Sequence, residues 1–268
     1  FVANIYDSVQ EVLGVANSLQ IGSYPRFTAI TPLHDLDVLY ILGQWNPQQH
    51  DPNQALTNLE AQLNADYENP THYAAVISRQ THSITIKFMD GEDEVFGVDV
   101  VPAYVSGTNN YGEDMYVVPE IAVKAHRERR QLREAVSKGE RQMAWIPSDP
   151  RGYIAVARQL NAVNEDFRKA VKFAKGWRAS CKAADDDFPL KSFHLEQAIT
   201  RWVAAHPQTD IFDIIFEFFC CLPDFIRYPQ IPDRADPTRN IDGYVAELSE
   251  ADRRKVIEAR DGFLIKLE

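Results

Sequence analysis

Two aspartates, Asp35 and Asp37, stand two residues apart at the start of an apolar run, Asp-Leu-Asp-Val-Leu-Tyr-Ile-Leu. Residues two apart in a strand point to the same side, so we expect both carboxylates at one edge of a sheet. Like charges held so close repel each other unless a cation lies between them, and oxygen ligands favour Mg²⁺ or Mn²⁺. The pair therefore predicts a divalent-cation site.

A third aspartate, Asp99, lies inside the apolar run from Phe96 to Val101. A carboxylate there is costly to bury without a partner, and a metal ion held by a neighbouring strand would be that partner. Three carboxylates on two strands suit two-metal phosphoryl transfer, in which one ion activates a hydroxyl and the other steadies a triphosphate and its leaving pyrophosphate. We predict Asp35, Asp37 and Asp99 as catalytic, metal-binding residues.

Gly22 and Ser23 precede a short helix that Pro25 predicts near residues 24–30. Glycine lets the backbone approach a ligand, and amides and a hydroxyl before a helix can hold triphosphate oxygens. Gly-Ser and acid-x-acid pairs are individually common in so acidic a chain. Their order is the informative feature: Gly-Ser, then Asp-x-Asp opening an apolar strand, then an Asp within a later apolar strand.

Two segments of the chain resemble the signature of the DNA polymerase β-like nucleotidyltransferases: Gly22-Ser-Tyr-Pro-Arg-Phe-Thr-Ala-Ile-Thr-Pro-Leu-His-Asp-Leu-Asp37 and Val98-Asp-Val-Val-Pro102. Three later segments resemble the oligoadenylate-synthase and cGAS/DncV-like enzymes, the CD-NTases of bacterial anti-phage (CBASS) systems: Trp145-Ile-Pro-Ser-Asp-Pro150, Lys172-Phe-Ala-Lys-Gly-Trp177 and Lys191-Ser-Phe-His-Leu-Glu196. The resemblance covers residues 5–262.

The resemblance implies a role for each matching residue. The three aspartates would bind two Mg²⁺ or Mn²⁺ ions, and Asp99 would help to deprotonate the acceptor hydroxyl. Gly22 and Ser23 would contact the donor triphosphate, and Lys175 and Ser192 would reach its β- and γ-phosphates. The implied substrates are ATP or other NTPs, and the implied product is a cyclic di- or trinucleotide second messenger. Regulatory or effector proteins of a defence operon would be its partners.

Other functions stay open at this stage. A nucleotidyltransferase could instead modify tRNA, a protein or a small molecule. A module that only senses RNA is disfavoured by the intact carboxylate trio and by the net charge of −11, which opposes strong nonspecific nucleic-acid binding.

Several candidate residues also have ordinary structural interpretations. Lys172 and Lys175 lie three apart on one helix face, which suits a polyanion or simply solvent. Ser192 could instead cap a helix together with Glu196. Arg26 would contact phosphate or face solvent. The role of His194 is also undecided: it could stack in the cleft or pack in the core. The basic run 127–133 could form a solvated face, or a surface for a partner or nucleic acid.

The elements that must position these residues follow from hydrophobic periodicity. We expect an opening helix through Leu19, strands over 35–42, 76–77, 83–88 and 95–101, and a helix over 53–66 between the first two strands. After residue 120 the pattern becomes mostly helical, over 151–182, 191–205, 209–221 and 249–261. The expected fold is α+β: a catalytic sheet domain over 1–145 and a helical domain over 146–268, with the active site in the cleft between them.

Composition agrees with an ordinary globular protein that carries an uneven charge. The chain has 268 residues, and residues 1–120 contain 3 basic and 16 acidic side chains, whereas residues 121–182 contain 15 basic and 6 acidic ones. An acidic part followed by a basic part suggests a cation site and an anion site. The 3 cysteines form no CxxC pair, and no segment reads as a membrane span or signal peptide, so we expect a cytoplasmic protein.

Overall fold

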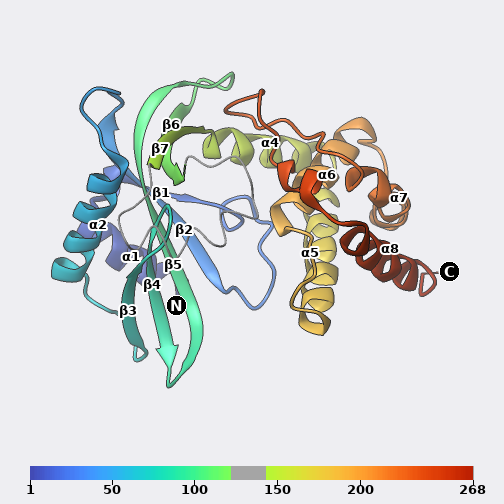
Figure 1. Cartoon of the computed structure of the whole chain (residues 1–268), viewed down its shortest axis with the longest axis horizontal. Helices are drawn as coiled ribbons and strands as arrows, with labels where there is room; N and C mark the ends of the chain where they lie inside the picture. Colours follow the sequence, from blue (N-terminus) through green and yellow to red (C-terminus); the bar gives the residue numbers. More distant parts are fainter. Residues whose placement is uncertain (122–142, 268) are drawn as a thin grey trace. The chain divides into compact units, whose positions relative to one another are not determined.

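The computed structural model describes residues 1–121 and 143–267. The chain divides into two compact units (Figure 1). A sheet unit consists of Phe1–Pro25 and Thr31–Gly152, and a helical unit consists of Arg26–Ile30 and Tyr153–Glu268. The predicted α+β class is confirmed. The assignment of functional domains to 1–145 and 146–268 stays a prediction, as does the basic surface expected at 127–133, which falls outside the described residues.

The sheet unit is built on a mixed seven-stranded sheet whose central path runs β1-β2-β5-β4-β3. Its strands are β1 (Ser18–Ile21), β2 (Asp35–Gln44), β3 (Ala74–Arg79), β4 (Ile84–Asp90), β5 (Asp93–Thr108), β6 (Asp114–Ile121) and β7 (Met143–Ser148). The two strands with the predicted carboxylates, β2 and β5, are parallel neighbours, and the other pairs are antiparallel. Such a parallel pair needs a long connection, which here runs through α2, β3 and β4.

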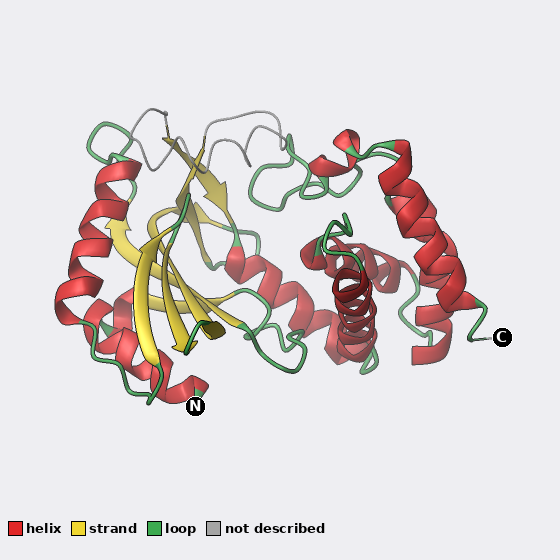
Figure 2. Cartoon of the chain, turned by 60° about the horizontal axis from the view of Figure 1, so that its bottom comes forward, coloured by secondary structure: helices red, strands yellow, loops and turns green. Residues whose placement is uncertain are grey.

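Helices α1 (Val2–Leu13) and α2 (Pro52–Asp66) cover one face of this sheet (Figure 2). Their apolar stripes pack on the alternate residues of β2, β4 and β5 that point to that face, and the shared core includes these fully buried side chains: Ile5, Val9, Leu56, Leu59, Leu36, Val38, Ile86 and Val98. Asp51 caps α2 by accepting a hydrogen bond from the Gln54 amide at 2.8 Å. One face of the sheet is therefore filled, which directs polar side chains to the other.

The opening helix is shorter than its periodicity predicted. It ends at Gly14, whose φ of 87° suits glycine, and the chain continues as a short 3-10 turn and then as β1. Leu19 therefore lies in a strand, paired with Leu39 of β2. The prediction of a helix through Leu19 was wrong. An apolar residue at position 19 fits helical periodicity and a buried strand position equally well, so the pattern alone could not locate the end of the helix.

Strands β6 and β7 were missed because each contains a proline. Pro119 pairs with Trp145, and Pro147 pairs with Val117. Strand β7 pairs only with β6, so it is an edge strand in the described sheet, where a missing backbone donor is tolerated. The Trp145 indole donates to the His50 carbonyl at 3.0 Å, which ties this edge to the loop before α2.

The helical unit consists of helices packed around a second core, together with the short segment Arg26–Ile30. The helices are α4 (Pro150–Val163), which begins at the end of the sheet unit, α5 (Phe167–Ala184), α6 (Ser192–Ala205), α7 (Ile211–Phe225) and α8 (Glu250–Leu264). The expected single helix over 151–182 is broken at Asn164. The Asn164 side chain donates to the Pro207 and Thr209 carbonyls and accepts from the Asp166 amide. These side-chain bonds to the backbone stabilise a non-helical connection between α4 and α5.

The segment Arg26–Ile30 is not the predicted short helix. It forms a turn and an extended stretch, and Phe27 has a φ of 59°, a conformation that is rare for a bulky residue. Pro25 favours a helical first turn, but Arg26 is paired with Glu196 of α6. In the part of the chain that the structure describes, no helix is both long and apolar enough to cross a bilayer.

His194 lies in the core of the helical unit, which confirms core packing over stacking in the cleft. It is 2% exposed, its Nδ1 lies 2.8 Å from the Tyr244 hydroxyl, and its Nε2 lies 3.8 Å from Asp242 Oδ2. Burial lowers the pKa of His194 to about 4, with Asp242 opposing and Lys191 reinforcing the shift. The imidazole is therefore neutral in the folded protein at neutral pH.

This burial predicts a loss of stability in mild acid. The unfolded chain binds a proton near pH 6.5 and the folded chain only near pH 4, so stability is full above pH 6.5 and falls as the pH drops toward 4. The expected loss between pH 7 and pH 5 is about 2 kcal/mol. Urea unfolding at the two pH values checks it, and His194→Gln should remove most of the difference. An equal difference in the variant would contradict this assignment.

Candidate active site

The three predicted carboxylates lie on the face of the sheet that α1 and α2 leave uncovered. Asp37 and Asp99 are direct neighbours in the parallel β2–β5 register, and Asp35 is paired with Gly97. Neighbouring strands lie about 4.8 Å apart, so the three side chains start from adjacent positions on one side of the sheet. The spacing-based prediction that Asp35 and Asp37 share a face agrees with this register.

Alternation along both strands explains the placement. Leu36 and Val38 on β2, and Val98 and Val100 on β5, are at most 1% exposed in the core below α1 and α2. The aspartates between them must point the opposite way, where Asp35 is exposed and the other two are half-buried. Three negative charges are thereby kept at the surface of the sheet rather than inside it.

The Gly22 backbone lies very close to this group of carboxylates. It follows the last residue of β1, Ile21, which pairs with Asp37. Its φ is 73°, and a Cβ atom built on it would lie 1.8 Å from Asp37 Oδ2. Only glycine satisfies both the backbone conformation and this close approach. The predicted phosphate-binding loop, Gly22 and Ser23, thus begins in contact with a predicted metal ligand.

Sequence reasoning missed two polar side chains on the same face. The Thr85 hydroxyl donates a short hydrogen bond to Asp99 Oδ1, and Lys87 Nζ lies 2.6 Å from Glu94 Oε2. Thr85 pairs with Asp99 and Lys87 with Gly97, so both belong to the carboxylate side of the sheet. The alternation in Ser-Ile-Thr-Ile-Lys-Phe, residues 83–88, carried the signal, because every second residue there is polar.

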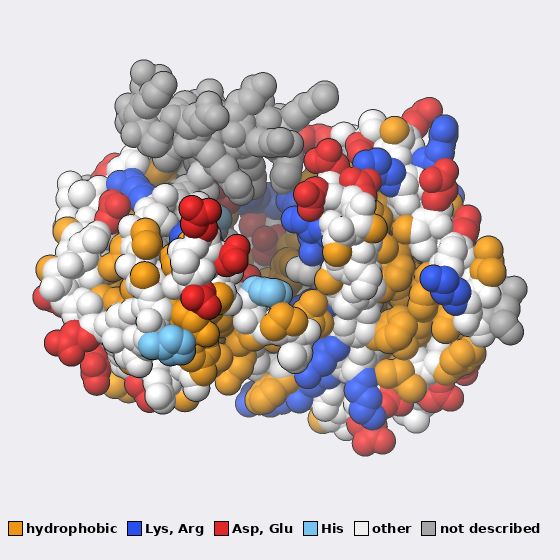
Figure 3. All heavy atoms as spheres, turned by 90° about the horizontal axis from the view of Figure 1, so that it is seen from below, with side chains coloured by type: hydrophobic (Ala, Val, Ile, Leu, Met, Phe, Trp, Pro, Cys, Tyr) orange, Lys and Arg blue, Asp and Glu red, His pale blue; other side chains and the backbone are white. Residues whose placement is uncertain are grey.

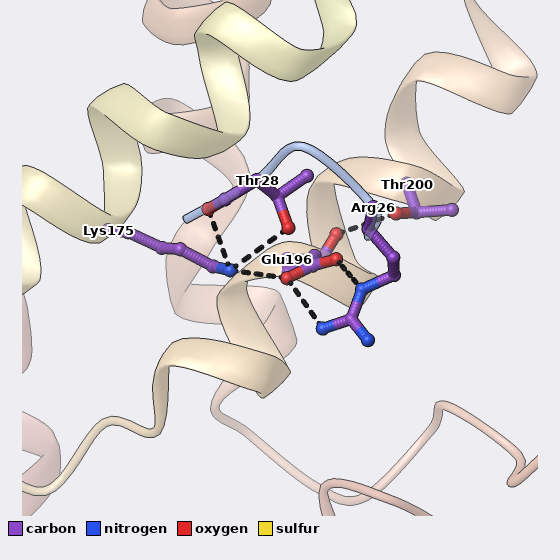
Figure 4. Close-up of polar contacts among 5 residues, drawn as sticks. All are labelled: Arg26, Thr28, Lys175, Glu196 and Thr200. Carbon is purple, nitrogen blue, oxygen red and sulfur yellow. Dashed lines mark hydrogen bonds and ion pairs between the residues drawn. The ribbon is translucent and has the colours of Figure 1, made fainter. Parts of the chain in front are cut away.

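Lys175, the predicted phosphate ligand on α5, is buried in the helical unit. Its Nζ donates to Glu196 Oε2 at 2.5 Å, to the Thr28 carbonyl at 3.0 Å and to the Thr28 hydroxyl at 3.3 Å (Figure 4). An ammonium group has three donor protons, so a direct bond to a phosphate would require one of these contacts to open. Its contact with phosphate stays a prediction.

The neighbouring candidates have unequal surroundings. Lys172 is exposed although it lies on the same helix as the buried Lys175, so the two do not form one basic face. Ser192 is the first residue of α6 and does not cap it; the cap position is Lys191 and has no side-chain cap bond. Arg26 is 7% exposed and pairs with Glu196, so of its two alternatives the solvent-facing one was wrong, and a contact with phosphate stays untested.

The charge pattern of each unit is visible on its surface. In the face shown in Figure 3, the sheet unit carries acidic side chains, and the helical unit carries basic as well as acidic ones. Among the described residues of the sheet unit the Lys and Arg side chains are Arg79, Lys87 and Arg151, and Lys87 is paired with Glu94. Three carboxylates on adjacent strand positions favour a cation beside them.

Comparison with known proteins extends these observations. The sequence matches no protein-family model and no curated protein. Solved structures do match: CdnC of Escherichia coli MS115-1 with ATP has a TM-score of 0.66 at 17% identity, over 99% of this chain and 83% of that one. The CdnE cyclic dinucleotide synthase of Elizabethkingia meningoseptica, with GTP and Apcpp, has a TM-score of 0.60 at 11% identity, over 99% and 90%.

A third match is the DncV of Escherichia coli in its 3'-deoxy GTP bound form, with a TM-score of 0.64 at 15% identity over 93% of this chain and 63% of that one. These proteins are CD-NTases. The chain has the CD-NTase fold. The expected polymerase β-like nucleotidyltransferase fold is thereby confirmed, and at these identities the likeness concerns the fold.

Within this CD-NTase fold, the carboxylate group fits a hard divalent cation by its chemistry. All of its donors are oxygens, two of the carboxylates come from directly paired strand positions, and the Gly22 backbone lies against Asp37 with no side chain of its own. In residues 1–121 and 143–267 no three His, Cys, Asp or Glu side chains already converge as a closed metal site.

Proposed function

We propose that the protein is a nucleotidyltransferase that joins NTPs through phosphodiester bonds, releases pyrophosphate and forms a cyclic di- or trinucleotide. The observation that carries this proposal is the register of Asp37 beside Asp99, with Gly22 approaching the Asp37 carboxylate. Carboxylates on adjacent strands and an open backbone loop next to them are the parts that metal-assisted transfer of a nucleotidyl group needs.

Asp35, Asp37 and Asp99 would hold two Mg²⁺ or Mn²⁺ ions, which when bound would activate the acceptor hydroxyl and neutralise the triphosphate. Asp99 is the proposed acceptor of the hydroxyl proton, and the Thr85 hydroxyl fixes the orientation of its carboxylate. The Gly22 and Ser23 amides and the Ser23 hydroxyl would bind donor phosphate oxygens. Ser192 and Lys175 are proposed to contact the β- and γ-phosphates.

Several known structures with this fold support NTPs as the substrate class. CdnC was solved with ATP, CdnE with GTP and Apcpp, and the CdnE of Rhodothermus marinus is a c-UMP-AMP synthase. We infer that ATP or other NTPs are both donors and acceptors here. Cyclisation requires that the same carboxylate site catalyses each bond in turn. The linear intermediate would have to reorient while bound, so that its other end reaches this site.

We further propose that the product is a second messenger in anti-phage (CBASS) signalling in the cytoplasm. CdnC of Escherichia coli MS115-1 was also solved in complex with a HORMA protein. A regulatory protein of comparable role, or an effector that binds the product, would be encoded with this enzyme. Pyrophosphate release from each NTP in the presence of Mg²⁺ or Mn²⁺, measured with and without proteins of the same operon, tests this proposal.

The Thr85 contact predicts a specific loss of activity. Thr85→Val keeps the shape of the side chain but removes the hydroxyl that donates to Asp99, and we expect activity to fall by about 10–100-fold, as for other partners that orient metal ligands. The apparent affinity for Mg²⁺ should fall with it. Thr85→Ser restores a hydroxyl and should recover most of the activity. Equal activities of Thr85→Val and wild type would show that this bond does not serve the reaction.

A further inference from the structure

A buried carboxylate of α6 lies at the centre of an ion cluster in the helical unit (Figure 4). Glu196 is 1% exposed, and its oxygens serve cations from two distant parts of the chain. Arg26 Nε lies 2.5 Å from Oε1, Arg26 Nη2 lies 3.2 Å from Oε2, and Lys175 Nζ lies 2.5 Å from Oε2. The two cations favour the charged carboxylate and lower the pKa of Glu196, against the effect of its burial.

This cluster holds the segment Arg26–Ile30, which we call the strap. Arg26 bonds Glu196 directly and also lies with its guanidinium carbon 5.3 Å from the Phe193 ring centroid. Lys175, held by Glu196, donates to the Thr28 carbonyl. Arg26 and Thr28 are therefore fixed by one carboxylate, once directly and once through Lys175.

The strap needs such fixation because its own backbone does not favour this shape. Phe27, between the two anchored residues, has a φ of 59°, and a bulky residue holds that conformation only where its surroundings determine it. Phe27 is also 62% exposed, so burial of its own side chain does not hold it; the Arg168 guanidinium carbon lies 4.8 Å from the ring centroid. The anchored residues Arg26 and Thr28 stand on either side of Phe27 and are placed to impose the turn.

The position of the strap in the sequence makes the anchoring relevant to the site. Only Tyr24 and Pro25 separate Arg26 from Ser23, and the chain returns from Ile30 to Asp35 at the start of β2. The Gly22–Ser23 loop and the first predicted metal ligand are thus the two flanks of the strap. Movement of the strap would be passed to both flanks through a short length of backbone.

We propose that Glu196 is a positioning residue: it fixes the strap through Arg26 and Lys175 and thereby preorganises the Gly22–Ser23 loop for the nucleotide triphosphate. This inference rests on the proposed function. Glu196 would not touch the nucleotide; its carboxylate acts through the strap and through Lys175, which it holds. Hydrogen exchange over the strap and its flanks reports the first of these routes. Replacing it with a neutral group leaves Arg26 and Lys175 buried without this anion, so the strap loses both anchors at once.

The test compares Glu196→Gln with Asp242→Asn. Asp242 is a second buried carboxylate of the helical unit, 0% exposed, which accepts hydrogen bonds from the Gln230 and Ile231 amides, both far from the strap in sequence. Both variants lose a buried anion of the same unit, so a merely structural role for Glu196 predicts similar behaviour. The two readouts are amide hydrogen exchange over residues 22–34 and steady-state kinetics with NTP and Mg²⁺.

For Glu196→Gln we expect amides of the strap and its flanks to exchange at least about tenfold faster than in wild type. The KM for NTP should rise and kcat/KM should fall about 100-fold, since a loop displaced by about 1 Å can cost this much. Asp242→Asn should lower Tm but leave exchange over 22–34 and the KM as in wild type. Arg26→Gln combined with Glu196→Gln should lose no more than Glu196→Gln alone, because the ion pair between Arg26 and Glu196 is already lost in that variant.

Unchanged exchange over 22–34 in Glu196→Gln, or the same exchange and kinetic losses in Asp242→Asn, would overturn the proposal. If Glu196→Gln does not fold, Arg26→Gln removes one of the two anchors while Glu196 keeps Lys175. Exchange over 22–34 and the KM should then rise in the same direction but by less. If wild type forms no product from any NTP, the proposed function fails, and exchange alone still decides whether Glu196 holds the strap. The two failures are therefore distinguishable.

Discussion

Asp35→Asn combined with Asp37→Asn is expected to lower nucleotidyl transfer by at least about 10³-fold without unfolding the protein. The two substitutions remove two of the three carboxylates that would hold the metal ions and keep the size of each side chain. Because Asp37 and Asp99 lie directly opposite each other, removing one charge also relieves a like-charge repulsion. Product formation and thermal unfolding, measured on the same preparation, check both parts.

The matched control for this variant is Asp66→Asn combined with Asp90→Asn. Both residues are exposed acids of the same unit, at the end of α2 and of β4, away from the carboxylate group. The control lowers the negative charge by the same amount, so it should keep full activity. Activity near wild type in Asp35→Asn/Asp37→Asn would refute the assignment of the site. A collapse of Tm in that variant would show that the two aspartates hold the fold instead.

Gly22→Ala should lower activity by about 100-fold and also cost some stability. The added Cβ would lie 1.8 Å from Asp37 Oδ2, so either the loop or the carboxylate must move. A displacement of about 1 Å at a positioned group is enough for a loss of this size. The φ of 73° adds about 1–2 kcal/mol of backbone strain for a residue with a side chain.

Gly91→Ala is the control that separates backbone strain from the steric clash with Asp37. Gly91, in the β4–β5 turn, has a φ of 62°, but a Cβ there would meet no atom within 4 Å. This variant should show the backbone cost alone, with activity as in wild type. If Gly22→Ala and Gly91→Ala lose the same stability and Gly22→Ala keeps its activity, the close approach of Gly22 to Asp37 has no role in the reaction.

The carboxylate group could be predicted from the sequence because its cause is local. Period-two alternation placed Asp35 and Asp37 on one side of a strand and Leu36 on the other, and the register of β2 with β5 then brought Asp99 beside Asp37. The same alternation would have found Thr85. Helix periodicity similarly located α2, α6, α7 and α8 to within a few residues at their ends.

The role of Glu196 could not be predicted, because its cause is not local. Its pairing with Arg26 joins residues separated by 170 positions, and no periodicity reports such a contact. The strap shows the same limit: Pro25 favours a helical first turn, yet tertiary contacts hold Phe27 in a left-handed conformation. Lys172 and Lys175 look equivalent in sequence, but only the second has a buried anion to face.

The most direct test of the account is the product formed from nucleotides alone. The purified protein is incubated with all four labelled NTPs and Mg²⁺ or Mn²⁺, treated with phosphatase, and its products are separated and weighed by mass spectrometry. We predict a phosphatase-resistant cyclic oligonucleotide that is absent with Asp35→Asn/Asp37→Asn. Label transferred instead to tRNA, protein or a small molecule in a lysate, with no product from NTPs alone in either metal, would contradict the cyclic product.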